Sequence, residues 1–121
     1  MTTRLVRIYS YSRCSTCRKA INWLDSNNIP YEVLDIIENP PDNLLLNKAL
    51  NYLGDRKYLF NTSGASYRAI GSSAVKAMSD DQALEALVKD GKLIKRPFLV
   101  TPDEKILVGF KPEVWANLLL K

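Results

Sequence analysis

The chain contains no histidine and only two cysteines among its 121 residues. A structural zinc site usually takes four protein ligands, so these two thiols argue against such a site within one chain. No apolar run approaches the ~18–20 residues that cross a bilayer, and residues 1–14 lack the apolar centre of a signal peptide. No block of like charge is long enough to serve as a nucleic-acid-binding arm. We therefore expect a cytoplasmic protein with no membrane segment, no metal and no direct contact with nucleic acid.

The remaining composition is that of an ordinary globular protein. Hydrophobic residues make up 46% of the chain and charged residues 25%. There are no internal repeats, low-complexity tracts or linkers, so residues 1–121 are expected to form a single domain, and we expect a monomer. The net charge of +4 favours anionic ligands or surfaces.

Both cysteines lie in one short motif, Cys14-Ser15-Thr16-Cys17. It follows a strand-like run at 5–9 and opens a helical pattern, in which Cys17, Ala20, Ile21 and Leu24 recur on one face. A strand leading into C-x-x-C at a helix start is the thioredoxin-type redox arrangement. The helix dipole would face Cys14 and lower its pKa below the ~8.5 of free cysteine, without lowering the pKa of Cys17. Arg13 and Arg18 flank the pair and act in the same direction on Cys14.

The cysteine pair has two other interpretations. A structural disulfide would close a very short loop and restrict the unfolded chain little. Two inert core thiols remain an alternative, because free cysteine is among the most buried residue types. The spacing and the helix start favour redox or nucleophilic chemistry.

The patterns predict an α/β protein with the order βαβ, then a helical insertion at about 42–91, then ββα. Strands are expected at 5–11 and 31–36, as a parallel pair around a helix at 15–27. In the insertion, Asp42 is expected to cap a helix at 43–53, and Ser79 with Gln82 to form a capping box for a helix through Lys89. Short helical turns are expected between them at 55–60 and 66–70.

The last part of the chain predicts an antiparallel hairpin, with strands at 97–101 and 106–110. Pro112 suits the first turn of a final helix. Its inward-facing residues are expected to be Val114, Trp115, Leu118 and Leu119.

Four segments carry a resemblance to a known family. Residues 9–20 resemble the active-site segment of the family that unites glutaredoxin-dependent arsenate reductases (ArsC) with Spx-type regulators. Residues 59–64, followed by Tyr67 and Arg68, resemble its insertion motif, and residues 108–113 its last strand and helix start. Residues 90–97 resemble the approach to its cis-proline. The resemblance implies a thioredoxin-like fold and a cis Arg96–Pro97 bond.

The resemblance also implies particular site residues. The reductases use one nucleophilic cysteine, matched by Cys14, and three arginines that bind the oxyanion, of which Arg96 matches one. The other two arginines fall on Asn61 and Phe110, with Lys111 adjacent to the latter as a substitute. Neither Asn nor Phe replaces a bidentate guanidinium, so we expect weak or absent arsenate reduction. Restoring both arginines is expected to raise turnover if both positions face the thiol.

The leading functional hypothesis is a thiol-disulfide oxidoreductase without a bound cofactor. Cys14 would attack, Cys17 would resolve the mixed disulfide, Arg96 would hold the anionic end of the substrate and Pro97 would present its backbone. Glutathione, glutaredoxin or thioredoxin would be the external reductant. Spx-type regulators share the C-x-x-C, so the alternative is a redox switch that binds the RNA polymerase alpha subunit, although the chain lacks their longer charged tail. A third alternative is a redox-inert protein.

Several of these residues also have an ordinary structural interpretation. Arg96 and Lys111 could face solvent. Asn61 and Ser63 could be turn or cap residues. Tyr11 could cover the thiol or only pack, and the tryptophans Trp23 and Trp115 are expected to anchor the core.

Overall fold

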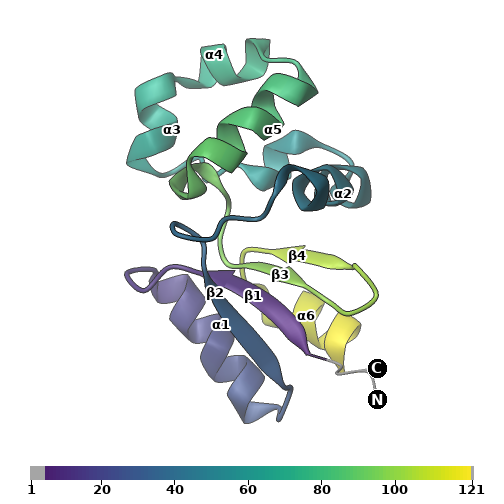
Figure 1. Cartoon of the computed structure of the whole chain (residues 1–121). Helices are drawn as coiled ribbons and strands as arrows, with labels where there is room; N and C mark the ends of the chain where they lie inside the picture. The colour runs from purple at the N-terminus through teal and green to yellow at the C-terminus, as the bar shows by residue number, and fades with distance from the viewer. Residues whose placement is uncertain (1–4, 121) are drawn as a thin grey trace. The chain divides into compact units, whose positions relative to one another are not determined.

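The computed structural model describes residues 5–120, and the chain groups into two compact units. One unit comprises the chain up to Leu34 and again from Arg96 onward, and the other comprises Asp35–Lys95. The described residues form four strands, six α-helices and two 3₁₀ helices (Figure 1). No helix within residues 5–120 is both long enough and apolar enough to cross a membrane.

The first unit is built on a four-stranded sheet with the strand order β2-β1-β3-β4. Its elements, in chain order, are β1 (Val6–Ser10), α1 (Ser15–Ser26), β2 (Tyr31–Asp35), β3 (Phe98–Val100), β4 (Ile106–Val108) and α6 (Pro112–Leu119). The Val6 N–H donates to the Pro30 carbonyl at 3.2 Å, so β1 and β2 begin at the same end of the sheet, as in a parallel pair. β3 runs antiparallel to both β1 and β4, which confirms the predicted hairpin.

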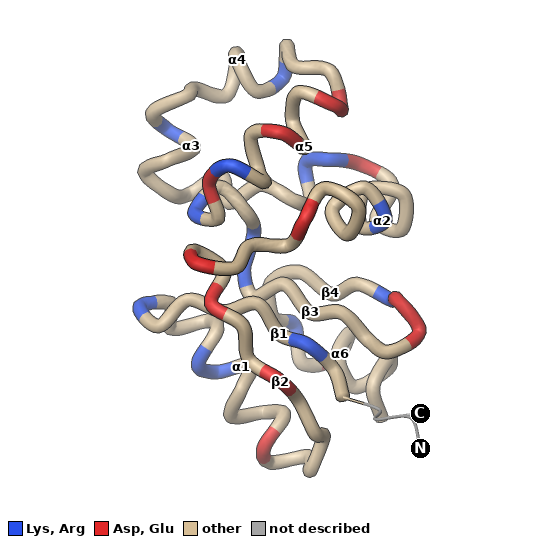
Figure 2. Tube along the Cα trace, in the orientation of Figure 1, with Lys and Arg blue, Asp and Glu red and all other residues tan. Residues whose placement is uncertain are grey.

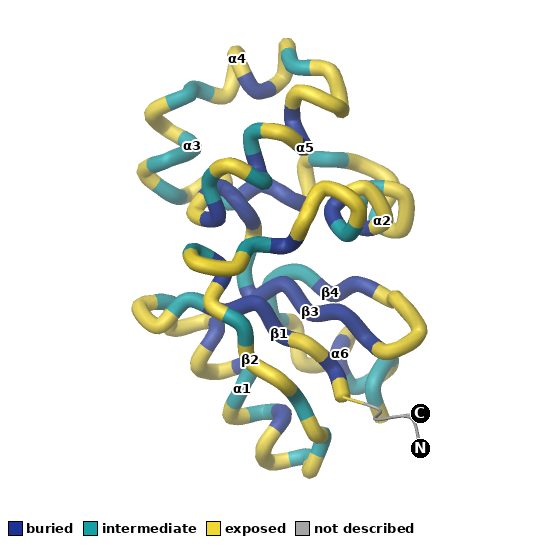
Figure 3. The backbone as a smooth tube through the Cα atoms, viewed as in Figure 1, coloured by how far each residue is buried: buried dark blue, intermediate teal, exposed yellow. Residues whose placement is uncertain are grey.

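One face of this sheet packs against α1 and α6. Side chains alternate along a strand, so Val6 and Ile8 point to the same side, and the register places Leu99 beside Ile8 and Leu107 beside Leu99. These side chains form one buried cluster with residues of the two helices, namely Ala20, Leu24 and Trp115. Figure 3 shows β1 and β3 as mostly buried segments. The thioredoxin-like order of strands and helices is therefore confirmed.

The second unit is the predicted helical insertion. It contains α2 (Asn43–Leu53), η1 (Arg56–Leu59), α3 (Ala65–Ile70), α4 (Ser72–Ala77), α5 (Asp80–Lys89) and η2 (Gly91–Leu93). Asp42 caps α2 by accepting the Leu45 N–H at 2.8 Å. Both halves of the capping box of α5 are present, since Ser79 Oγ accepts from the Gln82 N–H at 3.1 Å and the Gln82 side chain accepts from the Ser79 N–H at 2.9 Å.

Two expectations differ from the structure. The sequence did not predict α4, which has six residues, buries only Val75 and lacks a side-chain cap. Val114 was expected to face inward but is 47% exposed, because the inward face of α6 is centred on Trp115. Leu118 and Leu119 are partly buried against the core, as expected.

Candidate active site

Cys14 stands where β1 has ended and α1 begins. Its backbone N–H donates to the Tyr11 carbonyl at 2.9 Å, which closes a tight turn over residues 11–14. Cys14 is the N-cap residue of α1, and its sulfur accepts the backbone N–H of Cys17 at 3.2 Å. A helix N-terminus has unpaired N–H groups and the positive end of the helix dipole, so it favours a negative charge at this sulfur. The predicted placement of the C-x-x-C motif is confirmed.

The surroundings of the half-buried Cys14 thiol stabilise its ionised form. Burial raises its pKa, but hydrogen bonds from the Cys17 thiol and backbone N–H lower it, and the Arg96 guanidinium lowers it further through a hydrogen bond and its charge. The net effect is a Cys14 pKa below the ordinary value for cysteine, in the predicted direction. Thiolate is the nucleophilic form of cysteine, so this sulfur is suited to attack.

Cys17 has the opposite environment. The residue is fully buried, and burial together with the hydrogen bond and charge of Cys14 raises its pKa to about 11. Two groups act in the other direction, the Tyr11 backbone and the Ser10 hydroxyl. Both cysteines are free thiols in this structure. The pair therefore combines an accessible, acidic thiol with a buried one that holds its proton.

Ser10 is a contributor that the sequence analysis did not name. It is the last residue of β1 and is only 8% exposed. Its position in the sequence could have identified it, because the last residue of a strand that leads into the C-x-x-C helix lies close to the two cysteines.

Arg96 reaches the site from the start of the hairpin. The Arg96–Pro97 peptide bond is cis, as predicted. Arg96 is half-buried, and its Cζ lies 4.9 Å from the centroid of the Tyr11 ring. The guanidinium lies over the Tyr11 ring and is one of the causes that lower the Cys14 pKa, which argues against a fully solvated surface arginine.

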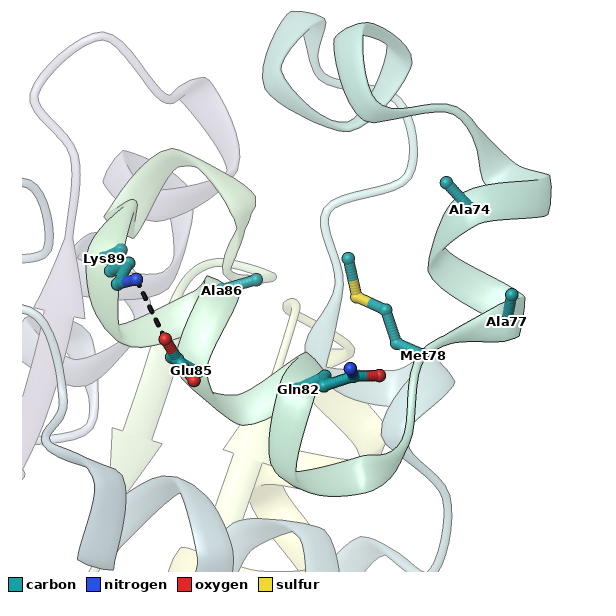
Figure 4. Close-up of a pocket in the computed structure, with 7 residues that line it drawn as sticks. All are labelled: Ala74, Ala77, Met78, Gln82, Glu85, Ala86 and Lys89. Carbon is teal, nitrogen blue, oxygen red and sulfur yellow. Dashed lines mark hydrogen bonds and ion pairs between the residues drawn. The ribbon is translucent and has the colours of Figure 1, made fainter.

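The second unit has a hollow of its own, between α4 and α5 (Figure 4). It encloses about 520 Å³ and is lined by Ala74, Ala77, Met78, Gln82, Glu85, Ala86 and Lys89. Its polar side chains are already engaged, since Gln82 belongs to the capping box and Glu85 pairs with Lys89 at 2.9 Å. No group of three or more metal-ligating side chains occurs within residues 5–120. The candidate site is therefore the one around Cys14.

Comparison with protein families decides how this site is classified. Residues 9–118 match the model of the ArsC family. The chain belongs to the ArsC family. Solved structures similar to this chain include arsenate reductase-like proteins, and the family match runs through both compact units.

Individual relatives span both branches of the ArsC family. The uncharacterised protein YusI of Bacillus subtilis is 43% identical over 114 residues, covering 89% of this chain and 96% of YusI. The crystal structure of a possible arsenate reductase from Streptococcus mutans is 41% identical with a TM-score of 0.83, covering 90% of this chain and 93% of that one. The global transcriptional regulator Spx of Listeria monocytogenes is 26% identical over 111 residues, covering 90% of this chain and 82% of Spx.

Phe110, one of the two positions where this chain lacks an arginine that the resemblance to the reductases implies, faces the core. Its ring centroid lies 5.0 Å from that of Trp115 and 6.2 Å from that of Trp23, both in edge-on geometry. Trp23 and Trp115 also meet each other at 6.0 Å, so the expectation that both anchor the core is confirmed. The Phe110 side chain therefore points into this aromatic cluster. The adjacent Lys111 is exposed and is the N-cap residue of α6.

Asn61, the other such position, belongs to the second unit and has local contacts. Its backbone N–H donates to the Leu93 carbonyl at 2.7 Å, and its side-chain oxygen accepts from the Ser63 hydroxyl at 3.3 Å. The Arg68 guanidinium donates to the Ser63 carbonyl at 2.6 Å. These contacts support the alternative that Asn61 and Ser63 are turn residues, while anion binding by Asn61 stays a prediction.

The two arginines that flank the cysteines are both exposed. Figure 2 shows basic residues at the turn before α1 and in its first part. Arg18 donates to the Ser12 carbonyl at 2.8 Å and so folds back over the turn. The causes that lower the Cys14 pKa are Cys17 and Arg96, so an effect of Arg13 or Arg18 on that pKa stays a prediction.

Proposed function

We propose that this ArsC-family protein is a thiol-disulfide oxidoreductase of the cytoplasm, with Cys14 as nucleophile and Cys17 as resolving thiol. One observation carries the proposal: the Cys14 sulfur caps α1 with a lowered pKa while the buried Cys17, three residues on, has its pKa raised. Two-step thiol exchange requires two thiols with these different pKa values, since one thiol attacks first and the other stays protonated until the second step. A dithiol that an external thiol returns to its reduced form fits the cytoplasm, where glutathione and thioredoxin keep thiols reduced. The family match supports treating the whole chain as one functional domain.

The proposed reaction begins when the Cys14 thiolate attacks one sulfur of a substrate disulfide. A bond forms between Cys14 Sγ and that sulfur, the substrate S–S bond breaks, and the first substrate thiolate leaves. Cys17 then attacks Cys14 Sγ, its proton passes to the second departing sulfur, and a Cys14–Cys17 disulfide forms. The substrate gains two electrons and two protons, one proton from Cys17 and one from solvent, which had taken up the proton of Cys14. The protein disulfide is returned to the dithiol by an external thiol reductant: glutathione, glutaredoxin or thioredoxin.

The raised pKa of Cys17 suits the second step because part of its cause disappears after the first. Burial raises this pKa most, and the hydrogen bond and the charge of Cys14 add to it. When Cys14 is bound in a mixed disulfide it has no negative charge, so both Cys14 contributions vanish. Cys17 then loses its proton more readily than in the resting protein. The resolving thiol is thereby activated only after Cys14 has reacted.

Arg96 and Pro97 are proposed to bind the substrate beside Cys14. The Arg96 guanidinium would hold an anionic group, and Pro97 would present its backbone to the substrate chain. Arsenate is proposed to be a poor substrate, because one family arginine is replaced by the core residue Phe110 and another by Asn61. Lys111 is the exposed cation next to Phe110 and is the candidate to test for residual anion binding.

The test is capture of mixed disulfides with single-cysteine variants. Cys17→Ser, treated with oxidised glutathione, should accumulate one glutathione adduct on Cys14, whereas Cys14→Ser should form none at neutral pH. The wild type should pass through the adduct to an intramolecular disulfide, visible by mass spectrometry as the loss of two hydrogens. Equal adduct formation on both single variants, or none on Cys17→Ser, would contradict the assigned roles.

A second candidate function is supported by the relatives named as regulators. This chain is similar to the global transcriptional regulator Spx over 90% of its length, so the same thiol pair is proposed as a redox switch on a surface that binds the RNA polymerase alpha subunit. The purified alpha subunit should then be retained by one redox state of the protein and released by the other. Cys14→Ser should remove this dependence on redox state. Equal capture in both states, or no capture in either, would leave the oxidoreductase as the sole candidate.

A further inference from the structure

The strand register explains why Tyr11 meets Arg96. In the antiparallel pair of β1 and β3, Tyr9 lies opposite Phe98, and their rings meet edge-on with centroids 5.7 Å apart. Continuing that register two residues beyond each strand places Tyr11 opposite Arg96, on the same face as Tyr9. The Arg96 Cζ lies 4.9 Å from the Tyr11 ring centroid, within the range of a cation–π interaction.

Tyr11 is also tied to the reactive thiol through the backbone. Its carbonyl accepts the Cys14 N–H at 2.9 Å, so ring and sulfur belong to the same tight turn. Arg96 approaches from a distant part of the chain, next to β3, on a long side chain with many rotamers. A ring fixed to the turn of Cys14 therefore gives this guanidinium a defined place next to the thiol.

We propose that Tyr11 is a positioning residue whose ring holds the Arg96 guanidinium beside the Cys14 sulfur. The inference rests on the proposed function, in which Cys14 reacts as a thiolate. Tyr11 acts through Arg96 and needs no contact with substrate. The property that matters is the face of the ring, and the phenol hydroxyl plays no part. An exposed or partly exposed cation–π contact biases the population of the arginine by about two- to fivefold.

The test is a double-variant cycle in the full chain, in a Cys17→Ser background that leaves one thiol to observe. The measured quantity is the rate of iodoacetamide labelling of Cys14 at a pH below its pKa, divided by the plateau rate at high pH. This ratio reports the thiolate fraction and removes differences in access to the sulfur. Tyr11→Leu should lower the ratio by about two- to fivefold, and Tyr11→Phe, which keeps the ring, should leave it unchanged.

The second arm of the cycle asks whether Tyr11 acts through Arg96. Arg96→Met should lower the same ratio, and adding Tyr11→Leu to Arg96→Met should change it no further. Three results would overturn the proposal. Tyr11→Leu alone could leave the labelling ratio unchanged, Tyr11→Leu could lower it just as much in the Arg96→Met background, or Tyr11→Phe could lower it as much as Tyr11→Leu does. A structural role of the ring alone would give equal effects in both backgrounds.

One further measurement covers the case in which Tyr11→Leu does not fold. In the wild type, the side-chain protons of Arg96, assigned by their loss in Arg96→Lys, should be shifted upfield by the ring current of Tyr11. Unshifted signals would overturn the proposal. The labelling cycle does not depend on disulfide exchange, so failure of Cys17→Ser to form a glutathione adduct would refute the proposed function and leave this inference standing.

Discussion

Replacing Phe110 by arginine should destabilise the protein without creating arsenate reduction. In ArsC reductases this position supplies an anion-binding arginine, so the sequence alone favoured a gain of activity. In the structure the Phe110 ring packs on Trp115 and Trp23. Trp23 follows Cys14 by nine residues along α1, which corresponds to roughly 13 Å of helix. An arginine that took the direction of the Phe110 ring would therefore enter this aromatic cluster and point away from the thiol.

The magnitude follows from the contacts that are lost. Each of the two edge-on pairs contributes about 0.5–1.5 kcal/mol beyond the burial of apolar area. Phe110 is half-buried, so the lost burial adds about 1 kcal/mol, of which the arginine stem recovers part. The expected loss is about 2–3 kcal/mol of the free energy of unfolding, or roughly 8–12 °C in Tm for a domain of this size.

The assay combines urea unfolding with arsenate turnover in the presence of glutathione and glutaredoxin. Lys111→Arg is the matched control, because it adds a guanidinium at the adjacent exposed position without disturbing the aromatic cluster. Phe110→Arg should lower the urea midpoint with an unchanged m-value, while Lys111→Arg should not. A Phe110→Arg protein of wild-type stability whose arsenate turnover rises tenfold or more would refute this reasoning and show that position 110 can face the site.

Three further predictions concern the thiols and the second unit. Arg96→Met should raise the Cys14 pKa by more than Arg13→Gln or Arg18→Gln does, because only Arg96 is half-buried against the sulfur. The pH dependence of thiolate absorbance measures this pKa, and equal effects of all three substitutions would contradict the prediction. Cys14→Ser should lower the Cys17 pKa from about 11 because the charge of Cys14 is removed, while burial should keep this pKa above the ordinary value for cysteine. The pKa is measured from the ¹³Cβ chemical shift of Cys17 as a function of pH, and an unchanged midpoint would show that the charge of Cys14 does not act on Cys17. Gly91→Ala should lower the free energy of unfolding in urea by about 3 kcal/mol, because a Cβ at this position would overlap the Ile36 carbonyl. The control Ala77→Ser, on the exposed helix α4, should have little effect, and a Gly91→Ala protein of wild-type stability would contradict the prediction.

The parts of the fold that sequence could predict are those whose signal is local. The cap residue Asp42 and the capping box of Ser79 and Gln82 satisfy N–H groups three positions away, so a short string of residues determines them. The same holds for Cys14, which caps α1 within its own motif. The helix α4 was not predicted, and it has six residues, one buried side chain and no side-chain cap.

The parts that sequence could not predict depend on contacts between distant segments. Tyr11 and Arg96 meet only because β1 and β3 pair in one particular register, which their separate sequences do not reveal. The direction of Phe110 depends on two tryptophans from two helices, so alignment to the arginine of the reductases gave the position but not the side-chain orientation. Resemblance to a family can suggest which position corresponds to a functional residue, but the neighbours of a side chain in the folded chain decide where it points.

The same distinction applies to the charges around the thiol. Arg13 and Arg18 lie next to the cysteines in sequence, but both are exposed, and a charge in water acts weakly because the solvent has a high dielectric constant and its ions screen the field. Arg96 is distant in sequence, yet it is half-buried and hydrogen-bonds to Cys14. A cation in that position loses far less of its effect to solvent. The groups that lower the Cys14 pKa are therefore Cys17 at the helix start and Arg96, both in the folded first unit, and the weaker effect of the exposed Arg13 and Arg18 stays a prediction.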